Sequence, residues 1–168
     1  MSLSMYSASV PIFTRILTNL DSFLGKAAAW ADERKIDHNA LLLSRLSPDM
    51  FTFTRQVQNA CDFAAKTTAR LAGADVPDYA NTETSFAQLK ERIATVLKYV
   101  QGFKAEQFNG AETRVIKLPM GGTTMELTGE QFFVGFGLPN FYFHATSAYN
   151  ILRHNGIEIG KRDFLGPR

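Results

Sequence analysis

The chain has 168 residues, of which 45% are hydrophobic and 20% are charged, as in a folded globular protein with one core. Its formal net charge of +2 gives no electrostatic reason to expect a nucleic-acid partner, and no run of about 20 apolar residues predicts a membrane span. A single cysteine, Cys61, excludes an internal disulfide, and the N-terminal sequence lacks the pattern of a signal peptide. We therefore expect one domain over residues 1–168, located in the cytoplasm.

The first two long helices are predicted from apolar residues at helical spacing. The first covers residues 6–30, and a short helix is expected within 38–46. The second long helix is expected to start with Ser47 as N-cap and Pro48 as its first residue. Gly73 is well placed to end it, because a helix commonly stops at a glycine in the left-handed conformation.

A loop and a third long helix follow, and then a short pair of strands. Residues 74–83 are expected to form the loop, and Ser85 is the expected N-cap of a helix that reaches Val100. Residues 114–118 and 123–127 alternate in polarity on either side of a Pro-Met-Gly-Gly turn. This pattern predicts a small β-hairpin.

The last long helix is expected to form in two steps. A capped start at Thr128 is interrupted by Gly135 and Gly137, and the helix restarts at Pro139 and continues to about His154. Four long helices with one hairpin inserted before the last predict an all-α fold. We expect an up-down four-helix bundle, since this is the usual way to bury four apolar stripes.

Two smaller features are predicted to be structural. Cys61 shares an apolar stripe with Val57 and Ala64, which indicates a buried thiol without a reactive role. Near the C-terminus, Phe164 and Leu165 are expected to dock back onto the helices.

The chain contains three histidines, His38, His144 and His154. The last two are separated by about 15 Å along the predicted helix, so they cannot share a metal ion. Asn140 lies one turn before His144 and shares its face. Three interpretations of His144 remain open: a ligand-binding group beside Asn140, half of a weak metal site with Asn140, or a ring packed in the aromatic cluster formed by Phe141, Tyr142, Phe143 and Tyr149.

Five stretches together resemble the DinB/YfiT-like family of four-helix bundles, and within it an uncharacterised branch. The resemblance covers nearly the whole chain, and its two most specific motifs are the last two. The stretches are LSPDMFTFTRQVQNACDFA, RLAGADVPDY, TETSFAQLKERI, LPNFYFHATSAYNILRHNG and GKRDFLG.

Typical members of that family hold a divalent metal with one histidine from the second long helix and a His-x-x-x-His pair from the last. The Leu-Arg pair at 152–153 and Gly156 set the register of the second motif in this sequence. In that register His144 matches the second histidine of the pair and Asn140 the first, and Gln56 is the best match on the second long helix. Because amide oxygens are poor ligands for zinc, nickel or iron, the resemblance implies no intact metal site and no resident cofactor here.

The resulting expectation is a DinB-like protein that binds a small molecule in a polar cavity of the bundle through His144, Asn140 and Gln56, with no catalytic residue assigned. One alternative is a metal-dependent thiol transferase or isomerase that uses His144 as a ligand, helped by Asn140, Gln56 or Asp49. Another is a non-catalytic interaction module. The resemblance also implies a homodimer, and neither nucleic acid nor membrane is an expected partner.

Overall fold

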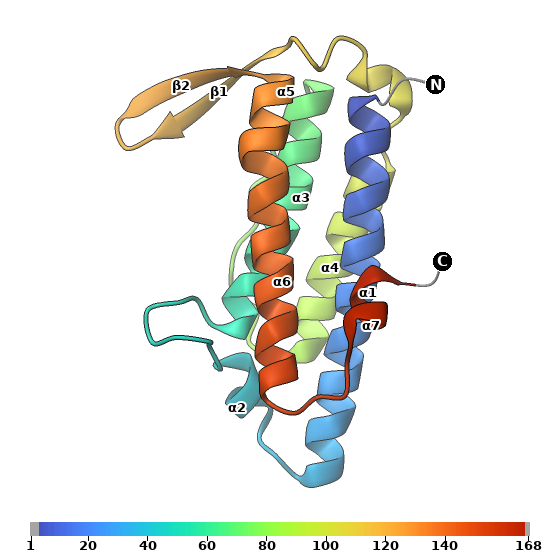
Figure 1. Cartoon of the computed structure of the whole chain (residues 1–168), viewed down its shortest axis with the longest axis vertical. Helices are drawn as coiled ribbons and strands as arrows, with labels where there is room; N and C mark the ends of the chain where they lie inside the picture. The colour runs from blue at the N-terminus through green and yellow to red at the C-terminus, as the bar shows by residue number, and fades with distance from the viewer. Residues whose placement is uncertain (1–3, 167–168) are drawn as a thin grey trace.

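Helices make up most of the structure, a computed structural model that describes residues 4–166. One antiparallel hairpin projects from one end of the helices (Figure 1). No helix among the described residues is long and apolar enough to cross a bilayer. In chain order the elements are α1 (Met5–Arg34), α2 (His38–Leu42), α3 (Phe53–Ala72), α4 (Phe86–Gln101), the 3-10 turn η1 (Ala105–Phe108), β1 (Val115–Met120), β2 (Thr123–Thr128), α5 (Gly129–Phe132), the π-helical turn η2 (Phe133–Gly137), α6 (Leu138–His154) and α7 (Lys161–Leu165).

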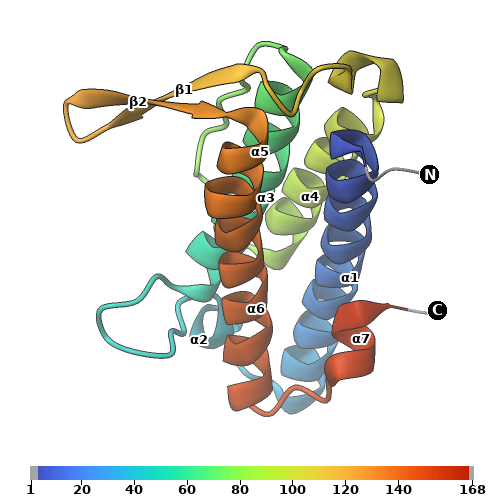
Figure 2. The same cartoon turned by 45° about the horizontal axis from the view of Figure 1, so that its top comes forward.

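The four long helices α1, α3, α4 and α6 pack side by side, and α3 runs in the same direction as α4 (Figures 1 and 2). At their first turns, the rings of Phe53 and Phe86 lie 6.1 Å apart. At their far ends, the hydroxyl of Tyr99 donates a hydrogen bond of 3.2 Å to the backbone carbonyl of Asp75. The helices α1 and α6 run in the opposite direction.

The strictly alternating up-down order expected from the sequence is therefore wrong at the step from α3 to α4. The segment between them, called the strap (residues 74–85), has no regular structure and runs back along the helices. About 12 extended residues can span roughly 40 Å, which is more than the roughly 30 Å length of a 20-residue helix such as α3. The strap is thus long enough for α4 to begin beside the start of α3.

The start of α3 also differs from the prediction. The helix begins at Phe53, and the hydroxyl of Thr52 caps it by accepting a hydrogen bond from the third helical N–H. Ser47 instead donates to the carboxylate of Asp49 in the irregular segment that precedes the helix. A Ser-Pro-Asp sequence can close such a local turn as readily as it caps a helix, so the expected start at Ser47 and Pro48 is wrong.

Other boundaries confirm the sequence predictions. Gly73 ends α3 with φ of 70°, and the hydroxyl of Ser85 caps α4. The last long helix ends at His154, and Gly156 follows with φ of 94°. The hairpin is present as well: β1 pairs with β2 in an antiparallel register.

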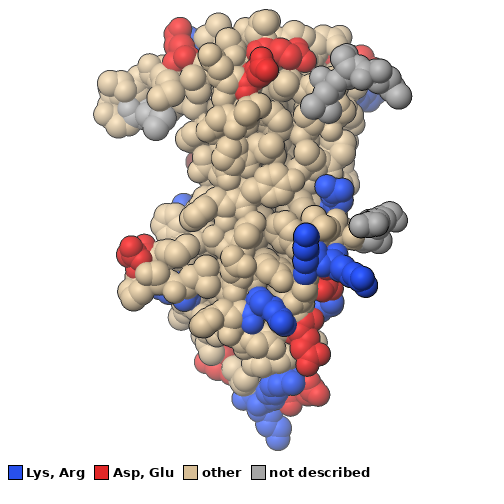
Figure 3. All heavy atoms as spheres, viewed as in Figure 1, with Lys and Arg blue, Asp and Glu red and all other residues tan. Residues whose placement is uncertain are grey.

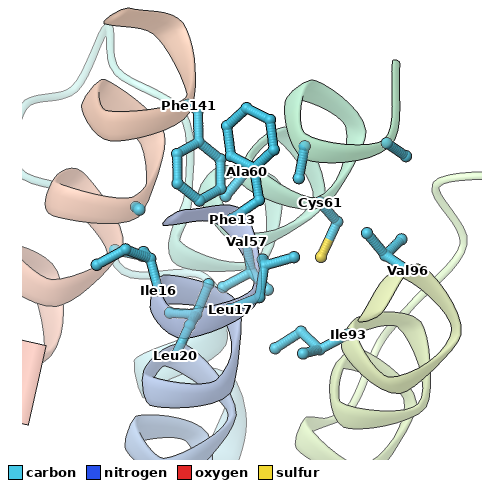
Figure 4. Close-up of a cluster of buried hydrophobic side chains, with 14 of the residues drawn as sticks. Phe13, Ile16, Leu17, Leu20, Val57, Ala60, Cys61, Ile93, Val96 and Phe141 are labelled. Carbon is cyan, nitrogen blue, oxygen red and sulfur yellow. The ribbon is translucent and has the colours of Figure 1, made fainter. Parts of the chain in front are cut away.

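The core lies between the four long helices and contains Cys61 (Figure 4). Cys61 is fully buried, and this burial raises the pKa of its thiol to about 12, so the thiol is unreactive in the folded protein. At the C-terminal end, Phe164 packs against Phe23 and Tyr149 as expected. Leu165 does not dock, because 47% of its surface is exposed.

Candidate functional site

His144 lies in the middle of α6 on the side that faces α3, and only 7% of its surface is exposed. Its Nδ1 atom is 2.7 Å from Oε1 of Gln56, and Nε2 of Gln56 donates to the backbone carbonyl of Phe51 at 3.4 Å. A carbonyl oxygen can only accept, so the bond to Phe51 orients the amide and makes Nδ1 of His144 the donor. In the neutral ring, Nε2 of His144 then carries the free lone pair.

The imidazole of His144 is neutral at pH 7. Burial first, and the positive charge of Arg55 second, lower the pKa of His144 from 6.5 to about 4. Nε2 therefore presents an unprotonated nitrogen, which can accept a hydrogen bond or bind an electrophile.

Three phenylalanines from three elements surround this ring, and we call them the phenylalanine rim (Phe51, Phe63 and Phe143). Phe63 stacks on His144 with ring centroids 5.5 Å apart and an interplanar angle of 19°. Phe51 and Phe143 lie 6.3 and 5.3 Å from it, and their exposed fractions are 51% and 56%. The buried histidine thus adjoins two aromatic side chains that reach solvent.

In Figure 3 the surface over the middle of α6 is largely uncharged, and positively charged side chains lie to its right, near α7. Exposed apolar side chains that adjoin one another are typical of binding sites. The phenylalanine rim therefore offers an apolar surface to a ligand, with one positive charge beside it, because the guanidinium carbon of Arg55 lies 5.8 Å from the ring of Phe51.

The structure brings His144 and Gln56 together, but it does not bring Asn140 into a hydrogen bond with either of them. Nδ2 of Asn140 donates to the backbone carbonyl of Phe136 at 2.8 Å, one turn earlier in the same chain segment. Among the described residues, Asn140 makes no other hydrogen bond through its side chain. A binding role for His144, Asn140 and Gln56 stays a prediction.

A π-helical turn leads into α6 where the sequence predicts an interruption. The helix continues through η2 without breaking, and Gly137 at its end faces Thr67 of α3. A Cβ atom at Gly137 would lie 2.8 Å from the side-chain atoms of Thr67. Only a glycine allows α6 to approach α3 this closely, about two turns before His144 meets Gln56.

Replacing Gly137 by alanine should lower the free energy of unfolding by about 1–3 kcal/mol, because the new methyl group overlaps Thr67 in a packed interface. Adding Thr67→Ala should recover most of this loss. Urea unfolding followed by circular dichroism measures both changes. Gly135 is the matched control, since a Cβ there meets nothing within 4 Å, and equal losses for Gly135→Ala and Gly137→Ala would contradict the steric account.

The divalent metal of typical DinB/YfiT-like proteins does not fit these residues. Oε1 of Gln56 already accepts the proton of His144, and the amide of Asn140 is turned toward its own helix. Within residues 4–166, no group of three or more His, Cys, Asp or Glu is placed to surround an ion. Nε2 of His144 is a single strong donor, whereas a zinc-type site needs three or four.

The remaining histidines and Asp49 lie outside this site. His38 contacts the Asp32 carboxylate at 2.9 Å near the end of α1, and His154 is an exposed residue at the end of α6. Asp49 is exposed and holds the hydroxyl of Ser47.

Sequence reasoning missed Phe51, Phe63 and Arg55. Phe63 could have been found, because it follows Gln56 by two helical turns and so shares its face. No sequence signal places the Phe51 carbonyl beside Gln56, or the Arg55 charge near His144.

Comparison with known proteins extends over almost the whole chain. Residues 5–165 match the family model described as "Domain of unknown function (DUF1993)". The structure is similar to the crystal structure of a DinB family member protein from Shewanella denitrificans, with 44% sequence identity and a TM-score of 0.91. The match covers 98% of this chain and 93% of that one. Among curated proteins, the search found no significant match.

Proposed function

The chain belongs to the DinB-like proteins of the DUF1993 family, and we propose that it binds a small molecule at His144, within a four-helix bundle of the family's type. The observation that carries this proposal is the hydrogen-bonded series from the Phe51 carbonyl through Gln56 to Nδ1 of His144. It holds the ring in one tautomer and leaves Nε2 as an acceptor. Nε2 of His144 is not one of the buried side-chain atoms that lack a partner in the described part of the chain, so this oriented nitrogen is open to a hydrogen-bond donor that approaches from solvent.

The chemistry of the site indicates which molecules fit. A hydrogen-bond donor is needed for Nε2 of His144, and an apolar, planar body suits the exposed rings of Phe51 and Phe143. The simplest probe with both features is phenol. Anisole has the same ring but no donor, so the pair separates the hydrogen bond from apolar contact.

Phenol should bind more tightly than anisole by about fivefold, which is the usual contribution of one hydrogen bond to a neutral acceptor. NMR titration should show shifts of the ring signals of His144 with phenol. In His144→Phe, which keeps an apolar ring at that position, phenol and anisole should bind equally. If phenol and anisole bind wild type equally, or neither perturbs His144, the proposed site is wrong.

The metal-dependent alternative starts from the same free nitrogen of His144. A metal ion would need further ligands that Gln56 and Asn140 supply only after giving up their hydrogen bonds. Stoichiometric zinc, nickel, manganese or iron in protein purified without a histidine tag would favour a thiol transferase or isomerase over simple binding.

The non-catalytic alternative, a homodimer, uses the same exposed apolar residues as a contact surface. Light scattering at micromolar concentration distinguishes it. A dimer that persists in wild type and dissociates in Phe143→Ser would favour an interaction module, since Phe143 is an exposed residue of the phenylalanine rim.

A further inference from the structure

An open cavity of about 500 Å³ lies along α4, with Tyr79 of the strap among its lining residues. This volume is in the usual range for small-ligand sites. None of its lining residues is on α3 or α6, the two helices that carry Gln56 and His144. Its lining side chains are Tyr79, Thr95, Lys98, Tyr99, Phe103 and Gln107.

The aromatic walls of this cavity are held in place by their own contacts. The rings of Tyr99 and Phe103 meet edge to face at 5.1 Å, and the Tyr99 hydroxyl is fixed on the carbonyl of Asp75. The ring of Tyr79, on the strap, lies 4.4 Å from the guanidinium carbon of Arg92. A flat apolar ligand would meet rings that are already oriented, which lowers the entropy lost on binding.

The polar groups of the cavity are predominantly hydrogen-bond donors. Lys98 carries an ammonium group, and Gln107 uses its carbonyl oxygen to accept the backbone N–H of Lys104 at 2.8 Å, so its NH₂ is left to donate. The hydroxyl hydrogen of Tyr99 is used on the carbonyl of Asp75, so the donors left for a ligand are those of Lys98 and Gln107, with the hydroxyl groups of Tyr79 and Thr95 beside them. No aspartate or glutamate is among the described residues that line it.

Donors, one positive charge and aromatic walls together define a ligand class. We propose that this cavity binds a small aromatic carboxylate, with its ring against Tyr99 and Phe103 and its carboxylate at Lys98 and the amide of Gln107. An ammonium group and an amide N–H both form stronger hydrogen bonds to a carboxylate than to a neutral acceptor. The site is separate from His144 and does not rest on the function proposed there.

NMR titration with 3-phenylpropionate tests the proposal, with 3-phenylpropan-1-ol and 3-phenylpropylamine as neutral and cationic counterparts. The acid should shift the backbone amides of Lys98, Gly102 and Gln107, and bind about fivefold more tightly than the alcohol. The amine should bind most weakly. Equal affinities for the acid and the alcohol, or shifts that avoid α4 and η1, would overturn it.

Three variants locate the charge effect. Lys98→Met should weaken binding of the acid about fivefold and leave the alcohol unchanged, whereas Lys161→Met, an exposed control on α7 and outside the lining, should change neither. Asp75→Asn should tighten binding of the acid about twofold, because the negative charge of Asp75 acts on Tyr99 at the edge of the cavity. Equal effects of Lys98→Met and Lys161→Met would overturn the proposal. His144→Phe should leave the affinity for the acid unchanged, so that failure of either site is seen separately.

Discussion

Replacing Arg92 by methionine should lower the free energy of unfolding by about 3–5 kcal/mol, the usual cost of removing one partner from a buried ion pair. The side chain of Arg92 is 4% exposed, and its guanidinium bonds the carboxylates of Asp62 and Glu83. It also donates to the backbone carbonyl of Ala80 at 2.9 Å and lies over the ring of Tyr79. Without Arg92, the largely buried carboxylates of Asp62 and Glu83 lose their shared partner, and the strap loses its main attachment to α4.

A second substitution separates charge from packing. Adding Asp62→Asn and Glu83→Gln to Arg92→Met should recover part of the loss in urea unfolding, because neutral amides remove two largely buried negative charges that keep, among the described residues, only Lys66 and the amide of Gln58 as partners. Arg15→Met, which changes an exposed arginine, should alter the free energy of unfolding by less than about 0.5 kcal/mol.

The rate at which the single cysteine is labelled measures how often the structure around it opens. Cys61 is buried next to Asp62, so its rate of labelling by a thiol reagent should rise in Arg92→Met under native conditions. A loss in the free energy of unfolding below 1 kcal/mol, with unchanged labelling, would show that Arg92 does not hold the strap.

Periodicity and end signals were sufficient to predict the long helices, apart from the start of α3. The hydrophobic spacing of α1 and α4 gave their extents to within a few residues, and Gly73 and Ser85 ended and started helices as expected. These signals are local: each depends on residues within a turn or two. That is why they can be read from a sequence without knowing the fold.

The direction of α4 could not be predicted in the same way. An apolar stripe shows which face of a helix is buried, but not which neighbour it meets or whether the two run parallel. In this protein the parallel packing of α4 beside α3 is stabilised by bonds between residues that are distant in sequence. Arg92 pairs with Asp62 on α3 and with Glu83 on the strap. The sequence contains these three charges with nothing to show that they meet.

Only part of the candidate site could be predicted, because one of its contacts also depends on the fold. The resemblance placed His144 and Gln56 at matching positions, and the structure brings them within 2.7 Å. The contact between Gln56 and Phe51 depends on where α3 begins. Had the helix started at Ser47, the carbonyl of Phe51 would have accepted a helical N–H, and it would not have been free for Gln56.

The stability of the protein should fall as pH decreases from about 6.5 to 4, and His144 should account for up to about 3 kcal/mol of that fall. The pKa of His144 is lowered to about 4 in the folded state, from an ordinary value of 6.5. Above pH 6.5 the ring is neutral in both states, so it contributes no pH dependence. Between these values only the unfolded chain takes up the proton, and each lower pH therefore favours unfolding.

The difference between wild type and His144→Gln isolates this effect, because His38, His154 and all carboxyl groups are present in both proteins. Urea unfolding at pH 7 and at pH 4 should show the wild type losing about 3 kcal/mol more than the variant. An equal loss in both proteins would mean that the ring is protonated in the folded state. Arg55→Gln should shrink the excess loss, since the guanidinium charge opposes protonation of His144 and its removal raises that pKa toward the ordinary value. Most of the excess should nevertheless remain in Arg55→Gln, because burial among the phenylalanine rim, and not the arginine, is the larger cause of the lowered pKa.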